Sequence, residues 1–434
     1  MRRRHLGAER PPRRAAPSPV DDQRVQIADR QVQLALVRRN PAHYSYLFTK
    51  ARSEDGCAYC LCRGTQTQMP RLVIRARAGR FHLAGWPDEG TQHAHHCDFF
   101  KLDGELTGRP IRGEGGILQT DDGTSIRLDV PLIVNTNGDV TATLDSPNPQ
   151  DGALSRRAVG LLGLTHFLWE ESQLNQWRQP RGSQRHWHTC RMRLRNLLED
   201  CTVNGQPLAD TLYLVPVFRR STSEIHKADF DRFQEQLGQH TGRSRRGLLL
   251  GEVKTIQPSQ YGHRIALRHL PRGLFASAKQ LERWQRSYAP AFSSAAGDTA
   301  RRIALLVVER RPLNGVLKVV DAAFMLTNRN YIPVDSSYEL RMADALADAG
   351  RRLVKPLRWD RSDDVFPDFV LTDTEPPTFV EVYGVRGRAS YEVRKRIKQA
   401  KYHQQGRTVI AWEVAHEMPT VTRFPAATRH LPEE

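Results

Sequence analysis

The stretch Pro367-Asp-Phe-Val-Leu-Thr-Asp-Thr-Glu-Pro-Pro-Thr-Phe-Val-Glu-Val-Tyr-Gly384 carries the strongest structural signal in the chain. Two apolar runs, Asp368–Thr372 and Thr378–Tyr383, flank a segment rich in turn-forming residues, which is typical of two paired strands. If the strands pair symmetrically about the middle of that segment, Asp368 and Glu381 lie opposite each other, with Cα atoms about 4.5–5.5 Å apart. Like charges in that position repel each other, and a divalent cation between them would reverse the sign of the interaction.

The elements on both sides of this hairpin complete an α/β block. A helix is expected over Ser336–Gly350, because Ser336 and Glu339 have capping-box spacing and Gly350 is a plausible stop. Glu339 shares the apolar face of that helix, so it is either a capping residue or a carboxylate that points at a metal. The remaining expected elements are a strand over Leu353–Trp359, a helix over Ser390–Gln405 and a strand over Thr408–Val414.

This block resembles the PD-(D/E)XK nuclease superfamily, whose core has the same αβββαβ order. Pro367-Asp368 looks like the PD element of that superfamily, and Glu381 looks like its second acid. The resemblance implies a restriction-endonuclease-like fold in which Asp368 and Glu381 bind Mg²⁺ or Mn²⁺ and Glu339 assists them.

The lysine of that superfamily's motif is missing from its usual position, where this sequence has Tyr383. Related nucleases carry the lysine on the following helix, and Lys398 has the matching spacing, with Lys395 and Lys401 as alternatives. The segment from residue 386 to 407 has eight Lys or Arg side chains and one acid, which is typical of a phosphate-binding strip. The residues expected to contact nucleic acid are Arg386, Arg388, Arg394, Lys395 and Lys401.

A cysteine and histidine segment near the N-terminus predicts a zinc site. Cys60 and Cys62 form one pair, and His93 and Cys97 form another about thirty residues later. An expected hairpin over Arg71–Leu83 would bring the two pairs together as a Cys₃His set, which suits structural Zn²⁺ and leaves no open position for catalysis. The alternative ligands are Cys57, His95 and His96.

Composition favours a polyanionic partner. The chain has 434 residues, with 65 Lys and Arg against 48 Asp and Glu, a net charge of +17. This excess is typical of nucleic-acid binding, or of a charge that serves solubility and needs no partner. The nuclease resemblance favours nucleic acid, and DNA over RNA. The sequence contains no run of 18 apolar residues, so no membrane span is predicted. The basic N-terminal segment has no apolar stretch like that of a secretory signal. Six cysteines are too few for a disulfide scaffold in a chain of this length. We therefore expect a reduced, cytoplasmic protein; its oligomeric state does not follow from the sequence.

The domain organisation expected from these patterns is multidomain α+β. A helix is expected over Asp22–Val37, and two helices, Leu154–Trp177 and Arg185–Cys201, would form a middle helical subdomain. The expected divisions are a basic tail and helix at 1–40, a zinc-binding β module at 41–110, β strands plus the helical subdomain at 111–215, a mixed region at 216–300 and the nuclease-like domain at 301–434.

Beyond the C-terminal block, the chain resembles a bacterial family, domain-of-unknown-function family 1173, over most of residues 52–414. No activity comes with that family, but its members look like cargo of plasmids and integrative elements. The residues that carry the resemblance are Cys60-Leu-Cys62, His93 with Cys97, Gly163-Leu-Thr-His-Phe-Leu-Trp-Glu-Glu171, Gly251-Glu-Val-Lys254 and Glu381-Val-Tyr-Gly384.

The expected function is a metal-dependent nucleic-acid phosphodiester hydrolase, a DNA endonuclease of a bacterial mobile element. The alternative is a catalytically inactive DNA-binding protein that retains the nuclease fold, because Tyr383 replaces the usual lysine. A literal E-x-K also occurs at Glu252-Val-Lys254, but no Pro-Asp strand precedes it, so it ranks below the C-terminal block.

Overall fold

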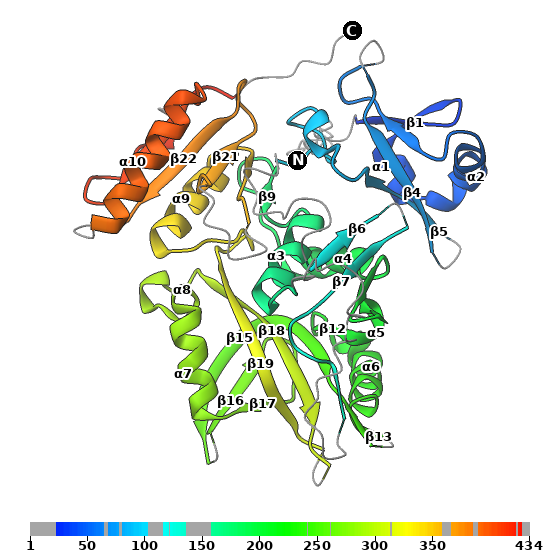
Figure 1. Cartoon of the computed structure of the whole chain (residues 1–434), viewed down its shortest axis with the longest axis vertical. Helices are drawn as coiled ribbons and strands as arrows, with labels where there is room; N and C mark the ends of the chain where they lie inside the picture. The colour runs from blue at the N-terminus through cyan, green and yellow to red at the C-terminus, as the bar shows by residue number, and fades with distance from the viewer. Residues whose placement is uncertain are drawn as a thin grey trace, which may run out of the picture. The chain divides into compact units, whose positions relative to one another are not determined.

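The computed structural model describes most of the chain as a mixed α+β protein (Figure 1). The described residues form five sheets and group into two compact units, one that extends to Lys101 and one over Leu102–Thr428. Among these residues, no helix is long and apolar enough to cross a membrane. The described ranges are 23–64, 68–77, 80–102, 116–120, 122–135, 158–240, 242–260, 262–312, 315–357, 366–384, 389–421 and 424–427.

The first unit is built on an antiparallel sheet with the order β2-β1-β3-β4-β5. The helix expected over Asp22–Val37 is wrong: a hairpin occupies most of that segment. Val25 and Ile27 alternate with more exposed residues and are fully buried, and Ala28 has a φ of 52°, which suits a tight turn. The elements of this unit are β1 (Arg24–Ile27), β2 (Arg30–Gln33), α1 (Leu34–Arg39), η2 (Pro41–Tyr44), α2 (Ser45–Glu54), β3 (Ala58–Cys60), β4 (Arg71–Arg77), β5 (Arg80–Gly85) and η3 (Gly90–Gln92).

The hairpin expected in the cysteine and histidine segment is present. Strands β4 and β5 pair with Arg77 opposite Arg80, which leaves a two-residue connection at the expected place; that connection lies outside the described residues. The start of β4 pairs with β3, so the hairpin is continuous with the strand that carries Cys60. The sheet thereby brings the two ends of the segment toward each other.

A strongly curved sheet forms the centre of the second unit. Its pairings close a cycle, β15-β16-β17-β19-β18 and back to β15, and β12 adds to the edge of β15. The run Ile303–Val308 is apolar throughout because both faces of β18 are covered: alternate residues belong to two different core clusters. The strands are β12 (Leu212–Leu214), β15 (Gly247–Ser259), β16 (Gly262–Leu267), β17 (Leu274–Ala276), β18 (Arg301–Arg310) and β19 (Leu317–Thr327). The boundary expected at residue 301 therefore falls inside one sheet, because β18 pairs with β15.

Helices and two small sheets surround this centre. The middle segment forms two helices, α3 and α4, but both are shorter than expected, and it also contributes a strand, β9 (Gln176–Trp177), to the C-terminal sheet. The other elements are α3 (Leu161–Glu171), α4 (Trp187–Leu198), α5 (Leu208–Thr211), η5 (Arg220–Thr222), α6 (Ser223–Glu235), α7 (Ala278–Ser287), α8 (Ala289–Phe292) and η6 (Ser294–Ala296), with β6 (Ile117–Gln119), β7 (Thr124–Ile126), β8 (Ile133–Asn135), β10 (Cys201–Val203), β11 (Gln206–Pro207), β13 (Gly238–His240) and β14 (Arg243–Arg245).

The C-terminal block has the expected order of helix, three strands, helix and strand. Its sheet has the strand order β23-β22-β21-β20-β9, in which β22 and β23 are parallel and the other pairs are antiparallel. Apolar residues of α9 pack against one face of this sheet, and α10 lies along the other face beside β22 (Figure 1). The elements are α9 (Ser337–Asp348), β20 (Leu353–Val354), β21 (Phe369–Leu371), β22 (Thr378–Tyr383), α10 (Ala389–Gln404) and β23 (Val409–Glu413).

The central hairpin pairs in the expected register. Phe369 lies opposite Val380 and Leu371 opposite Thr378, so one further step places Asp368 opposite Glu381. A buried ion pair holds the turn: Arg351 Nε and Asp373 Oδ2 are 2.8 Å apart, and a second guanidinium nitrogen donates to Oδ1 at 2.9 Å. Such a two-point contact fixes both position and orientation, so the hairpin presents its two acids at a defined place.

Candidate functional site

The four residues predicted as zinc ligands come together in the first unit. The Sγ atoms of Cys60 and Cys97 are 3.6 Å apart, and His93 Nδ1 lies 3.6 Å from Cys62 Sγ and 3.4 Å from Cys97 Sγ. All four ligand atoms lie within 4.8 Å of one another. Tetrahedral Zn²⁺ with bonds of about 2.3 Å to sulfur and 2.0 Å to nitrogen places neighbouring ligand atoms roughly 3.5–3.8 Å apart. The cluster could therefore hold zinc.

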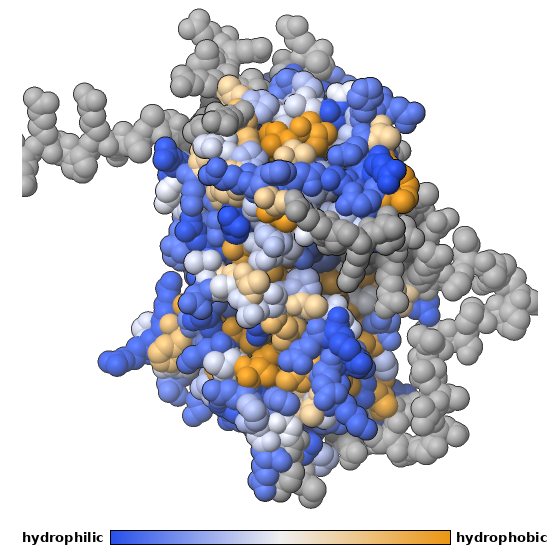
Figure 2. All heavy atoms as spheres, turned by 90° about the vertical axis from the view of Figure 1, so that its left-hand side faces the viewer, coloured by the Kyte–Doolittle hydropathy of each residue, from blue (hydrophilic) through white to orange (hydrophobic). Residues whose placement is uncertain are grey.

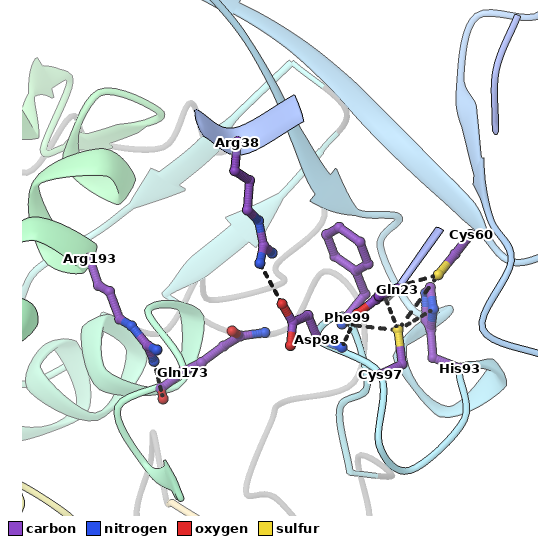
Figure 3. Close-up of polar contacts among 9 residues, drawn as sticks. All are labelled: Gln23, Arg38, Cys60, His93, Cys97, Asp98, Phe99, Gln173 and Arg193. Atoms are coloured by element: carbon purple, nitrogen blue, oxygen red, sulfur yellow. Dashed lines mark hydrogen bonds and ion pairs between the residues drawn. The ribbon is translucent and has the colours of Figure 1, made fainter. Parts of the chain in front are cut away.

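Hydrogen-bond donors surround the sulfur atoms of this cluster. The Gln23 side-chain amide donates to Cys97 Sγ at 3.0 Å and to Cys60 Sγ at 3.4 Å, as Figure 3 shows. The backbone N–H groups of Ala94 and Phe99 donate to Cys62 Sγ and Cys97 Sγ, each at 3.3 Å. Donors of this kind stabilise the thiolates that a metal requires.

Ionisation of the three thiols is graded. Hydrogen bonds with Cys60 and then with Cys97 lower the pKa of Cys62, whereas burial is the main cause that raises the pKa of Cys97. The hydrogen bond with Cys62 raises the pKa of Cys60 to about 12.

The alternative ligands lie outside this group of four. Cys57 is buried and interacts with Tyr59, and the ring of His95 packs edge-on against Phe100 with centroids 5.0 Å apart. His96 also falls outside the group whose ligand atoms converge. The structure thus selects the Cys60, Cys62, His93 and Cys97 set from the alternatives that the sequence left open.

A second group of charged side chains lies at the C-terminal sheet. Asp368 immediately precedes β21, and its Oδ2 accepts a hydrogen bond of 2.7 Å from the backbone N–H of Val382. Glu381 is buried on β22, where Lys398 Nζ lies 2.6 Å from Oε2 and the Tyr402 hydroxyl donates to Oε1 at 2.8 Å. Lys398 and Tyr402 therefore face the sheet, which decides the orientation of α10.

Glu339 joins this group through a lysine that sequence reasoning missed. Glu339 is buried near the start of α9, and its backbone N–H donates to Ser336 Oγ, as the capping interpretation predicts. Its Oε2 accepts from Asp335 N at 3.0 Å and lies 2.7 Å from Lys355 Nζ. The Ser336 cap is therefore present, but the Glu339 carboxylate accepts from Asp335 N rather than from Ser336 N, so the full capping box does not form and the carboxylate joins the charged group. Lys355 directly follows β20 in a run of buried residues, Leu353–Leu357, and a lysine inside the strand expected over Leu353–Trp359 was the available signal.

Burial governs the ionisation of these acids. It raises the pKa of Glu339 to about 7, against the attraction of Lys355, and it raises the pKa of Asp368 to about 6, with further repulsion from Glu381. Burial also raises the pKa of Glu381, although Lys398 opposes that shift. For Lys355, burial lowers the pKa, but the acids around it outweigh that effect, so the pKa lies above its ordinary value and the amine stays charged.

The acids do not converge as tightly as the cysteines. In the part of the chain that the structure describes, Cys60, Cys62, His93 and Cys97 are the one group of three or more potential ligands with converging atoms; Glu339, Asp368 and Glu381 do not form a second.

Tyr383 occupies the position of the missing lysine and is buried. Its hydroxyl has no hydrogen-bond partner among the described residues, and Lys395 Nζ lies 4.5 Å from the centre of its ring.

The basic residues expected to contact nucleic acid do not form one continuous strip in the described part of α10. Arg386 and Arg388 lie outside the described residues. Lys395 pairs with Glu413. The outer face of α10 carries two exposed apolar residues, Val393 and Ile397 (50% and 56% exposed), and the view from this side of the molecule shows hydrophobic groups among hydrophilic ones (Figure 2). Arg394 is exposed and Lys401 half-buried on the same helix.

The second E-x-K sequence forms an internal ion-pair network. Glu252 is buried on β15, with Arg268 Nε at 2.6 Å and Arg301 at 3.0 Å from Oε1. The Tyr331 hydroxyl donates to Oε2 at 2.9 Å, and Lys254 is exposed. Both oxygens of Glu252 thus contact protein groups, and its ion pairs link β15 to β18 and to the end of β16.

Comparison with known proteins gives a family without an assigned activity. No curated protein and no solved structure matches the chain. The family model described as "Protein of unknown function (DUF1173)" matches residues 31–415, which include both the cysteine and histidine cluster and the charged group at the C-terminal sheet. The chain therefore belongs to the DUF1173 family.

Proposed function

We propose that this protein is a metal-dependent nucleic-acid phosphodiester hydrolase, a DNA endonuclease whose site is made by Glu339, Asp368, Glu381 and Lys398. The observation that carries the proposal is the hairpin β21–β22, which sets Asp368 opposite Glu381, with the Lys398 ammonium 2.6 Å from Glu381. Two acids on neighbouring inner strands and a lysine from the helix that covers them supply both cation ligands and a phosphate contact.

The residues present suit a hard divalent cation such as Mg²⁺ or Mn²⁺. All the candidate donors are carboxylate oxygens. Burial raises the pKa of both Asp368 and Glu381, and repulsion from Glu381 raises that of Asp368 further. When bound, such an ion lowers the pKa of a bound water and stabilises charge on a phosphate.

The chain's own side chains would orient the reactants. The Val382 N–H holds Asp368 through Oδ2, and the Tyr402 hydroxyl holds Glu381 through Oε1. The Lys398 side chain is 17% exposed at the sheet, so its ammonium can reach and neutralise charge on a phosphate oxygen. The net charge of +17 supports a nucleic-acid substrate, because cations on the protein release counterions from the phosphate backbone.

A second candidate is a catalytically inactive DNA-binding protein on the same scaffold. It is favoured by Tyr383, which occupies the position of the superfamily's lysine with an unpartnered hydroxyl, and by the spacing of the three acids, which is wider than in the cysteine cluster. Both candidates predict salt-sensitive DNA binding, and only the first predicts cleavage.

Plasmid nicking in Mg²⁺ or Mn²⁺ separates the two candidates. The wild type is compared with Asp368→Asn and Glu381→Gln, and with Glu375→Gln as a matched control, since Glu375 is exposed in the turn of the same hairpin. The hydrolase proposal expects cleavage by the wild type and the control and a loss of at least a hundredfold in the two site variants. Cleavage that survives both site substitutions overturns it, and DNA binding without cleavage by the wild type favours the second candidate.

We also propose that Cys60, Cys62, His93 and Cys97 bind one structural Zn²⁺. The support is the match between the ligand spacing, 3.4–3.6 Å for three of the pairs, and the edges of a zinc tetrahedron. Elemental analysis of the full-length protein should give one zinc per chain. A folded chain that contains no zinc after expression in zinc-supplemented medium contradicts the proposal.

A further inference from the structure

Each acid of the charged group already has a partner inside the protein. Glu381 accepts from Tyr402 and lies 2.6 Å from Lys398, and Glu339 lies 2.7 Å from Lys355. Both carboxylate oxygens of Glu381, and Oε2 of Glu339, therefore already contact an ammonium or a hydroxyl, and Asp368 Oδ2 accepts from the Val382 N–H. A cation that enters this group has to compete with those contacts.

Lys355 is positioned for this contact by the fold. Its side chain is 3% exposed, and Nζ lies 2.7 Å from Glu339 Oε2 and 2.9 Å from Asp335 Oδ2. Asp335 is largely exposed, so Glu339 is the buried partner of Lys355. An ammonium buried without a partner would be strongly unfavourable, so the lysine and the acid stabilise each other's charge.

The backbone of Lys355 is held from a distant part of the chain. Its N–H donates to Asn175 O at 2.9 Å, and the Asn175 side chain donates to Lys355 O at 2.8 Å. Asn175 immediately precedes β9, which pairs with β20. The residue is therefore locked at the sheet, and only its flexible side chain can move when the contact with Glu339 is exchanged.

Lys398 makes the corresponding contact on the other side of the group. It reaches Glu381 from α10 with a side chain that is 17% exposed. Its ammonium is thus closer to solvent than that of Lys355, and it can turn toward an incoming anion at a smaller desolvation penalty. The two lysines give the three acids a formal sum of −1 when all five groups are charged.

We propose that Lys355 and Lys398 are internal counterions that a divalent cation displaces from Glu339 and Glu381, and that the phosphate of the substrate attracts the displaced ammonium groups; this inference rests on the proposed function. Cation binding and phosphate binding then favour each other. The cation frees the ammonium groups that contact the phosphate, and the phosphate holds those ammonium groups away from the acids. The lysines oppose the effect of burial on the ionisation of the acids, and they hold the acids in place until both arrive.

The test measures Mn²⁺ binding to the zinc-loaded, full-length protein by electron paramagnetic resonance at pH 8, where protons compete least with the cation. We expect Lys355→Met and Lys398→Met each to bind Mn²⁺ at least tenfold more tightly than the wild type, although both lose nuclease activity. Lys355→Arg keeps the charge and should bind Mn²⁺ like the wild type. Lys318→Met is the matched control, because Lys318 pairs with Glu309 in the central sheet.

The outcomes separate the inference from the function on which it rests. Wild-type binding of Mn²⁺ that Asp368→Asn abolishes, together with unchanged or weaker binding in both methionine variants, overturns the inference alone. Mn²⁺ uptake by neither the wild type nor the methionine variants overturns the proposed function as well. If Lys355→Met fails to fold, Lys398→Met decides the question, since its side chain lies on a partly exposed helix.

Discussion

Replacing Gln23 should weaken metal binding at the cysteine cluster without changing a ligand. The Gln23 amide donates to two of the three sulfurs, at 3.0 Å to Cys97 and 3.4 Å to Cys60, and its oxygen accepts from Asp98 N at 3.0 Å. A hydrogen bond to a charged group contributes about 1.5–3 kcal/mol. Because one nitrogen serves both sulfurs and the second contact is long, we count them as one such bond. Gln23→Leu should therefore raise the Kd for Zn²⁺ roughly tenfold to a hundredfold.

Competition with a chromophoric chelator under anaerobic conditions measures this change, and the visible absorption of the Co²⁺-substituted protein reports on the tetrahedral site. Gln23→Glu is the sharper variant: its carboxylate loses the donor and brings an anion toward the thiolates, so it should bind more weakly than Gln23→Leu. Gln26→Leu is the matched control, because the Gln26 side chain donates to the Ala28 carbonyl in the same hairpin rather than to a sulfur. If Gln23→Leu binds zinc within twofold of the wild type, the reasoning about sulfur hydrogen bonds is refuted.

Three further substitutions test other parts of the structure. Cys97→Ser should abolish zinc binding by elemental analysis, whereas Cys57→Ser should retain one zinc per chain; equal zinc contents would contradict the ligand set. Burial raises the pKa of Asp344 to about 6, so its ionised form destabilises the native state at pH 7, and this loss fades as the pH falls through 6 toward 4. Asp344→Asn should therefore melt at a higher temperature than the wild type at pH 7.5, with the gap roughly halved at pH 5 and mostly closed near pH 4; a gap that is constant with pH would refute the assignment. Tyr402→Phe removes the donor to buried Glu381 and should lower the free energy of unfolding by about 1–3 kcal/mol in urea denaturation, whereas Tyr46→Phe, at an exposed position, should leave it unchanged.

Local pattern was a good guide where neighbours in the sequence are neighbours in space. The symmetric register of the hairpin β21–β22 follows from the length of its turn, and the start of α9 follows from the cap at Ser336. The segment Asp22–Val37 was the exception. Its apolar residues at Val25 and Ile27 have the two-residue period of a strand, but they are followed by a true helix, so the two patterns merge in the sequence.

The sequence by itself determined the order of the C-terminal elements, the opposed pair Asp368 and Glu381, and the four residues that gather as a candidate zinc site. These features depend on turn length, caps and ligand spacing, all of which act over short stretches of chain. Only the tertiary structure decided that Gln23 supports Cys97 across 74 residues, and that Asn175 holds Lys355 across 180. Contacts at such separations leave no periodic trace in the sequence, because each depends on how whole sheets and helices pack rather than on any local preference.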